Sequence, residues 1–139
     1  MITLFASKMG TLKLTNILTD DLKQQLGVIY MKNNFEVIRP TGILDSVNTN
    51  NLRRDILETI NDEVKIILLD FQDITFMNSS GLGALVATLK AVKAEGGELA
   101  LCSLSDQVRI IFELSRMERI FKVFEDVNEF EAKHFVNAK

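Results

Sequence analysis

The 139-residue chain has 47% hydrophobic and 25% charged residues and a formal net charge of −3 at pH 7. This length suits one domain with a hydrophobic core of its own. The negative charge argues against a nucleic-acid-binding protein, which normally carries a concentrated basic patch. No apolar stretch approaches the roughly 18 residues that cross a bilayer, and residues 1–10 lack a signal-peptide pattern. We therefore expect a cytoplasmic protein without a transmembrane segment, in which the single cysteine, Cys102, is a small buried apolar residue.

Several interpretations of the first thirty residues remain open. Residues 2–6 and 11–14 have the pattern of a hairpin. The spacing of one helical face is shared by Leu18, Leu22, Leu26 and Ile29. Residues 27–31 also suit a short first strand, and Met31 suits an alternative start. We expect an N-terminal extension over residues 1–30 and the folded domain over residues 31–139.

From residue 35 onward, strand patterns alternate with helix patterns. Residues 35–39 alternate in period two, and Pro40 removes a ladder donor, so we expect an edge strand or a break there. Asp45 and Ser46 are candidate caps of a first helix, whose apolar residues recur every four positions at Leu52, Ile56 and Ile60. Residues 64–69 are almost continuously apolar, which is typical of a central strand covered on both faces.

The alternation continues to the C-terminus. A second helix carries an apolar stripe of Leu82, Leu85, Val86, Leu89 and Val92. It ends near residues 95–97, where glycine can close a helix. The remaining expected elements are a strand over 98–104, a helix capped by Ser105 or Asp106, a strand over 120–124, and a last helix to about Val136 with a capping box at 126–129. Strands alternating with helices predict an α/β fold with a parallel or mostly parallel sheet.

Residues 73–86 are the most informative stretch of the chain. They place Ser79 and Ser80 where a loop after a buried strand becomes a helix N-terminus. Both hydroxyls are candidate caps of that helix. The free N–H groups and the dipole of a helix start also favour a phosphate there. For an isolated Ser-Ser-Gly, capping alone is the more common role.

The run Phe76-Met77-Asn78-Ser79-Ser80-Gly81-Leu82-Gly83 resembles the signature of STAS domains. This family comprises anti-sigma-factor antagonists and the C-terminal domains of sulphate transporters. The resemblance covers about residues 35–130 and includes, in order, segments 41–45, 96–102, 108–115 and 120–124. It implies a STAS-like single domain. Such a domain has a central, mostly parallel sheet of four or five strands, with about four helices packed largely on one side.

The resemblance also implies a phosphorylation-switched protein-binding module. Anti-sigma-factor antagonists in the dephosphorylated form bind an anti-sigma factor that is also a serine kinase, and a PP2C-type phosphatase reverses the blocking phosphorylation. Carried over to this sequence, Ser79 is the acceptor and Ser80 the weaker candidate. The partner-binding residues are then Asp45, Asn78, Ser79, Ser80, Gly81, Leu82 and Gly83. Family members more often have Asp where this chain has Asn78, so a negative charge beside the acceptor is missing. We expect a monomer or a weak homodimer.

Catalytic and metal-binding patterns are mostly absent. His134 is the only histidine, which excludes a multi-histidine metal site. Met77 stands where a nucleophile elbow around Ser79 needs glycine, and neither a dinucleotide fingerprint nor a Walker lysine is complete. Gly81 and Gly83 are better explained by close approach of a backbone or a partner. We expect no enzymatic activity, no cofactor and no metal. The alternative function is a structural or scaffolding STAS domain in a larger signalling or transporter-associated assembly, whose serines only cap the helix.

Overall fold

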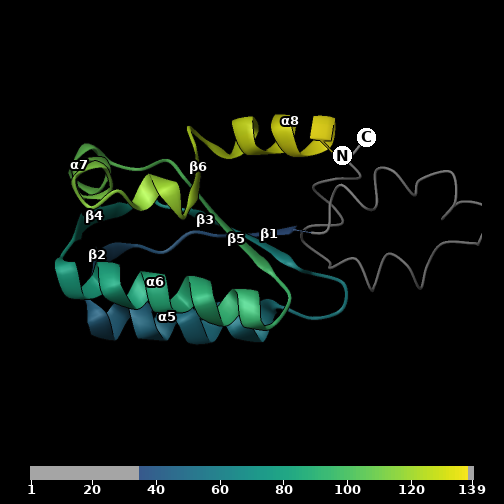
Figure 1. Cartoon of the computed structure of the whole chain (residues 1–139), viewed down its shortest axis with the longest axis horizontal. Helices are drawn as coiled ribbons and strands as arrows, with labels where there is room; N and C mark the ends of the chain where they lie inside the picture. The colour runs from purple at the N-terminus through teal and green to yellow at the C-terminus, as the bar shows by residue number, and fades with distance from the viewer. Residues whose placement is uncertain (1–34, 138–139) are drawn as a thin grey trace, which may run out of the picture.

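The structure, a computed structural model, describes residues 35–137 (Figure 1). Its elements are, in chain order, β1 (Phe35–Ile38), β2 (Gly42–Leu44), α5 (Ser46–Thr59), β3 (Ile66–Asp70), β4 (Ile74–Met77), α6 (Ser79–Ala94), β5 (Glu98–Cys102), α7 (Asp106–Leu114), the 3-10 helix η1 (Met117–Arg119), β6 (Lys122–Phe124) and α8 (Val127–Asn137). The interpretations of residues 1–30 and the domain start near Met31 lie outside the described residues.

Four parallel strands form the central sheet in the order β1-β3-β5-β6. This confirms the predicted α/β fold with a parallel sheet. The strand before Pro40 lies at the edge of the sheet and ends at Ile38, so the missing N–H of Pro40 removes no ladder bond. The continuous apolar run predicted as a central strand is β3, between β1 and β5. Among the described helices, none is long and apolar enough to cross a membrane.

Two sequence predictions need correction, one by a missed strand and one by a shifted start. The segment between the buried strand and Ser79 is predicted as a loop, but Ile74–Met77 forms β4, which pairs in parallel with β2 outside the central sheet. The predicted strand over 120–124 begins only at Lys122, because the backbone N–H groups of Ile120 and Phe121 donate to the carbonyl of Met117 and extend the η1 turn. In both cases the hydrogen-bond partners of the backbone determine where the strand forms, and a local sequence pattern does not reveal these partners.

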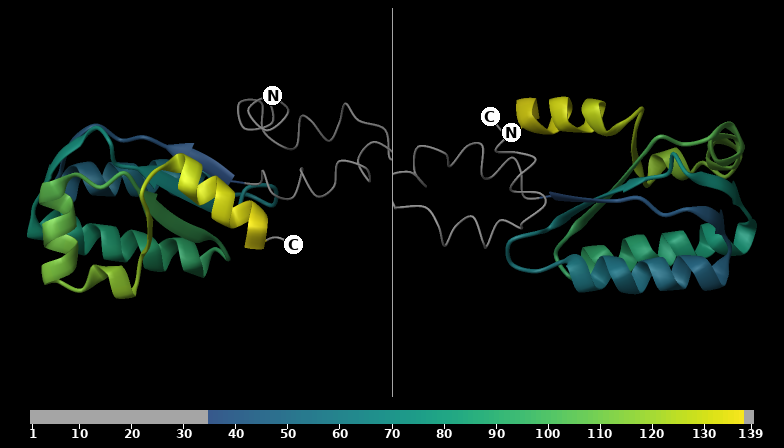
Figure 2. Two further views of the ribbon diagram at one scale, coloured as in Figure 1. Left: turned by 90° about the horizontal axis from the view of Figure 1, so that it is seen from above. Right: turned by 180° about the vertical axis from the view of Figure 1, so that it is seen from behind.

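The helices cover the two faces of the sheet unequally. Alternate residues of β3 and β5, such as Ile67 and Leu101, belong to a large core with α5, α6 and α7. The residues between them, Leu68, Ala100 and Cys102, face a smaller core under α8. Figures 1 and 2 show α5 and α6 on one side of the sheet and α8 on the other. Three of these four helices therefore share one core, which confirms the predicted packing largely on one side.

An ion pair between a half-exposed arginine and a buried aspartate fixes the direction in which the chain leaves β1. Arg39 follows β1, and its Nε and Nη2 atoms lie 3.0 and 2.9 Å from Oδ2 of Asp70 at the end of β3. The other carboxylate oxygen of Asp70 accepts a hydrogen bond from the backbone N–H of Gln72. The carboxylate is 1% exposed and would be costly to bury unpaired. The ion pair thereby fixes the chain just before it enters β2.

Cys102 lies in the smaller core, as predicted for a buried apolar residue. Burial raises the pKa of the thiol to about 11, because desolvation disfavours the thiolate. At pH 8 the native thiolate is therefore rarer by roughly two orders of magnitude than that of a thiol with a pKa near 9. The thiolate is the species that reacts with alkylating agents.

We predict that iodoacetamide labels Cys102 very slowly in the native protein at pH 8 and rapidly after unfolding in guanidinium chloride. Intact-mass measurement over time gives both rates, and the absence of any other cysteine makes the assignment unambiguous. Native labelling as fast as that of the unfolded chain would contradict the burial of Cys102 under α8.

Candidate functional site

The candidate site begins where β4 leads directly into α6. Asn78, the one residue between them, has an extended backbone and is the N-cap: its Oδ1 accepts a 2.8 Å hydrogen bond from the backbone N–H of Gly81. The prediction that Ser79 and Ser80 cap this helix is therefore wrong. Both serines already belong to the first helical turn, whereas a capping side chain comes from the last extended residue.

The two serines differ in what their hydroxyls contact. Both residues are exposed. The Ser80 hydroxyl donates a 2.8 Å hydrogen bond to Oδ1 of Asn78, so it takes part in the cap. Within the described part of the chain, the Ser79 hydroxyl makes no such bond. Ser79 therefore presents an uncommitted hydroxyl at the first position of a 16-residue helix.

The parallel pairing of β2 with β4 places a second helix start beside the first. Leu44 is the register partner of Met77, so the residues that follow them, Asp45 and Asn78, leave the pair side by side. The backbone N–H of Asn78 donates to the carbonyl of Leu44 at 3.3 Å. Asp45 caps α5, because its Oδ1 accepts a 2.8 Å hydrogen bond from the N–H of Asn48. The predicted site residues Asp45 and Asn78 are thus brought together by backbone pairing.

The predicted glycines serve different purposes. Gly81 is buried, and a Cβ built on it would lie 1.9 Å from the carbonyl oxygen of Leu44. Only glycine allows β2 and α6 to approach so closely. Gly83 is exposed, with nothing within 4 Å of a Cβ at that position. Leu82 is half-buried against the main core. Of this predicted set, Ser79, Ser80 and Gly83 are the exposed members.

Sequence reasoning missed three exposed apolar side chains at this end of the molecule. Ile43 and Phe76 are register partners on β2 and β4 and are 48% and 45% exposed. Val47, in the first turn of α5, is 65% exposed. We call these three residues the apolar patch. A period-two pattern could not have found Phe76, because Ile74 and Met77 are both buried while Thr75 and Phe76 are both exposed.

Gln107, another missed residue, holds the end of β4. Its side-chain amide accepts a hydrogen bond from the N–H of Met77 at 3.0 Å and donates one to the carbonyl of the same residue at 3.1 Å. Gln107 lies on α7, 30 positions away in sequence. Its side-chain amide makes the two hydrogen bonds to Met77 that the backbone of a neighbouring strand would otherwise make. No local pattern indicates this role. Gln107 thereby fixes Met77, the residue that immediately precedes the Asn78 cap.

Among residues 35–137, no group of three or more His, Cys, Asp or Glu side chains is placed to hold a metal ion. The site consists instead of two adjacent helix N-termini, an exposed serine hydroxyl and an apolar patch. Such an arrangement can bind a protein surface. It can also accept a phosphate, because the first N–H groups of a helix have no intrahelical acceptors.

Comparison with known proteins identifies the family. Residues 28–130 match the family model of the STAS domain, and the chain belongs to that family. The anti-sigma F factor antagonist of Paenibacillus polymyxa is 28% identical over 91 residues, which cover 65% of this chain and 78% of that protein.

Solved structures are also similar to this chain. The anti-sigma factor antagonist SpoIIAA in its unphosphorylated form is 29% identical, with a TM-score of 0.56 over 74% of this chain and 88% of that one. The Bacillus SpoIIAA in its phosphorylated form gives 0.50 over 72% and 88%, also at 29% identity. A sulfate transporter family protein from Wolinella succinogenes has a TM-score of 0.64 over 75% and 88%, but at 16% identity it shows the fold alone.

The two glycines provide a matched pair of substitutions. We predict that Gly81→Ala destabilises the domain by about 1–3 kcal/mol or more, because the new methyl group overlaps the Leu44 carbonyl. Gly83→Ala, in the same helix and with open space, is expected to stabilise the domain by up to about 1 kcal/mol. Urea unfolding of both variants measures the difference. Equal unfolding midpoints would contradict the close contact of β2 with α6.

Proposed function

We propose that this STAS domain is an anti-sigma-factor antagonist that binds an anti-sigma factor while Ser79 is unphosphorylated. The same partner is proposed to be the serine kinase that modifies Ser79, and a PP2C-type phosphatase to reverse the modification. The exposed, uncommitted hydroxyl of Ser79 at the start of α6 is the observation that carries the proposal. Support also comes from a relative named as an antagonist and from SpoIIAA, solved with and without phosphate.

The fold can accept a phosphate on Ser79 at little cost. A phosphoserine carries about −1.5 to −2 charges at pH 7. At a helix N-terminus a negative charge is favourable by typically about 0.3–1 kcal/mol. The first turn of α6 contains no acidic residue, and the cap Asn78 is neutral. Phosphorylation therefore acts on the surface and leaves the packing of the domain unchanged.

The same charge opposes the docking of a partner. Phe76 of the apolar patch lies three residues before Ser79, and Val47 lies in the first turn of the neighbouring helix. A partner that covers the apolar patch also removes water from Ser79. Desolvating an unpaired dianion there costs several kcal/mol, which exceeds the small gain from the helix dipole. Binding rather than catalysis is thus the proposed activity, without cofactor or metal. Because sigma factors act in the cytoplasm, we propose that location for this domain.

We predict that phosphorylation of Ser79 weakens binding to the cognate anti-sigma factor by at least about a hundredfold, which corresponds to about 2.8 kcal/mol. The melting temperature is expected to change little. Ser79→Ala should bind like the wild type and should not be phosphorylated by the kinase, whereas Ser79→Asp should bind poorly. Calorimetric titration against the partner measures the affinity of each form. Peptide mapping after incubation with kinase and ATP identifies the phosphorylated residue, and melting curves of each form measure the thermal stability.

Ser80→Ala is the matched control, which should keep both binding and phosphorylation at Ser79. Modification of Ser80 alone would overturn the assignment of the acceptor. Equal affinities of the phosphorylated and unphosphorylated forms would favour the structural or scaffolding role instead. A large fall in melting temperature on phosphorylation would mean that the phosphate acts by unfolding the site.

We further propose that the domain begins near Met31 and that residues 1–30 are an extension. The family match starts at residue 28, so two truncated chains test the boundary. A chain that starts at Gly27 retains the whole matched region, and one that starts at Met31 removes its first three residues. Both are expected to unfold cooperatively in urea, because removal of an extension exposes little core. A molten or insoluble protein in both cases would place the earlier apolar residues in the core or in a dimer contact.

A further inference from the structure

A cavity of about 400 Å³ lies beside β5 and β6, at the opposite end of α6 from Ser79. Its wall includes Lys93 in the last turn of α6, 14 residues after Ser79, which corresponds to about 21 Å along a helix. This volume is within the range of about 300–1,000 Å³ that is usual for small-molecule sites. The cavity is therefore separate from the proposed docking surface.

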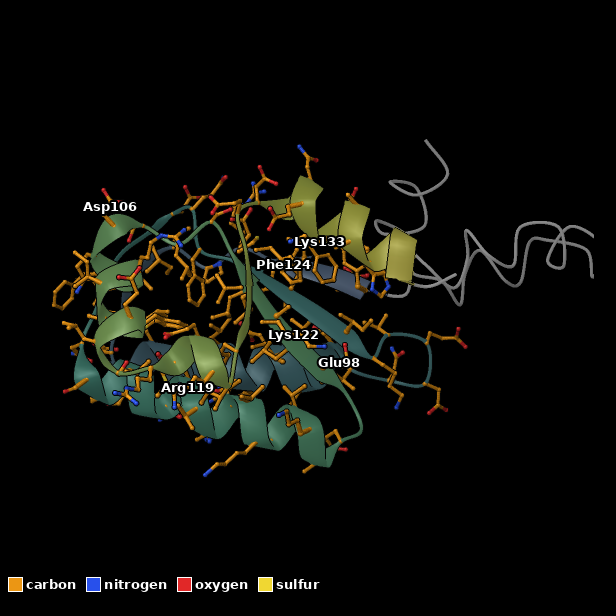
Figure 3. The ribbon with its side chains drawn as sticks, turned by 45° about the horizontal axis from the view of Figure 1, so that its top comes forward. Glu98, Asp106, Arg119, Lys122, Phe124 and Lys133 are labelled. Carbon is orange, nitrogen blue, oxygen red and sulfur yellow. The ribbon has the colours of Figure 1, made fainter. Side chains whose placement is uncertain are left out.

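The cavity exists because β6 is too short to cover β5. The pairing of β5 with β6 starts at Ala100 and Lys122, so Glu98 and Leu99 lie beyond the end of the shorter strand. The preceding chain turns away as η1. The edge of the sheet is thus left open between α6 on one face and α8 on the other. Figure 3 shows Lys122, Phe124, Lys133 and Glu98 around this opening.

Three cationic side chains from three different elements line the cavity. They are Lys93 of α6, Lys122 of β6 and Lys133 of α8. Glu98 is the one carboxylate among the described residues of the lining, and the ion pair of Lys133 is made with Glu129, 3.7 Å away. This local excess of positive charge is opposite in sign to the net charge of the whole chain, which is −3. It favours an anionic ligand.

One part of the cavity lining is apolar. Leu99 and Ile120 contribute aliphatic surface, and Phe124 and Phe130 contribute aromatic rings 5.1 Å apart in an edge arrangement. The ring of His134 stacks on Phe130 at 5.4 Å. Burial lowers the pKa of His134, so this ring is mostly neutral at pH 7 and extends the apolar wall. A ligand that fits must combine an anionic group with an apolar body.

We propose that this cavity binds an amphipathic organic carboxylate, with its hydrocarbon or aromatic body on the phenylalanine side and its carboxylate among the three lysines. A phosphate group usually binds to a helix N-terminus or to a cradle of backbone N–H groups. The described lining contains no helix start: its helical residues come from the middle and last turns of α6 and from the second and later turns of α8. Three lysine side chains without a cradle of backbone N–H groups can hold a carboxylate by charge alone.

The test uses decanoate as an aliphatic probe and 1-naphthoate as an aromatic one, titrated into the full-length chain. Saturable changes in amide chemical shifts are expected along residues 98–100 and 122–124, with a dissociation constant confirmed by calorimetry. Acetate, which has the charge without the body, and decanol, which has the body without the charge, should bind at least tenfold more weakly. Equal binding of decanol, or tighter binding of adenosine monophosphate than of either carboxylate, would overturn the proposal.

Charge variants locate the site. Lys93→Gln and Lys122→Gln should each weaken decanoate binding by about tenfold or more, the loss of one charge-assisted hydrogen bond. Glu98→Gln should tighten binding, because it removes the opposing carboxylate. Lys90→Gln is the matched control, since Lys90 is exposed on α6 but does not line the cavity. If Lys90→Gln weakens decanoate binding as much as Lys122→Gln does, the effect of charge is diffuse. That result would also overturn the proposal.

Discussion

The contact between the backbone of Leu44 and Gly81 determines the geometry of the functional end of this domain. Leu44 ends β2, and Gly81 lies in the first turn of α6. No other residue type fits, because a Cβ would lie 1.9 Å from the carbonyl oxygen. The contact brings the start of α6 against the start of α5. The caps Asp45 and Asn78, and with them Ser79, consequently lie on one surface.

This arrangement separates the residues that hold the site together from the residue proposed to be modified. Asn78 satisfies the N–H of Gly81, Gln107 holds the end of β4, and Ser80 bonds to the cap. Ser79 takes part in none of these contacts. A covalent change at Ser79 therefore removes no hydrogen bond from the fold. In contrast, a phosphate on Ser80 would replace a hydroxyl that donates to Asn78. The preference for Ser79 as acceptor thus has a structural reason in addition to its place in the motif.

The accuracy of sequence reasoning depended on whether an element is defined by its own residues. β3 was predictable because its first four residues, Ile66 to Leu69, are consecutive apolar residues. α6 was predictable from its apolar stripe and from Gly96, whose φ of 79° closes the helix. β2 and β4 have three and four residues and exist through pairing with each other. Their absence from the prediction moved the start of the helix and led to the wrong cap.

The parallel sheet also explains why the two ends of the domain differ chemically. Each described α-helix follows a strand, so α5, α6, α7 and α8 all begin at the carboxyl ends of strands (Figure 1). Helix starts carry partial positive charge, and this end is therefore suited to a phosphate without any basic side chain. The opposite end receives the negative end of the α6 dipole. An anion can be attracted there only by cationic side chains, and Lys93, Lys122 and Lys133 meet this requirement. Backbone charge thus favours a covalent phosphate at one end, whereas side-chain charge is needed for an anionic ligand at the other.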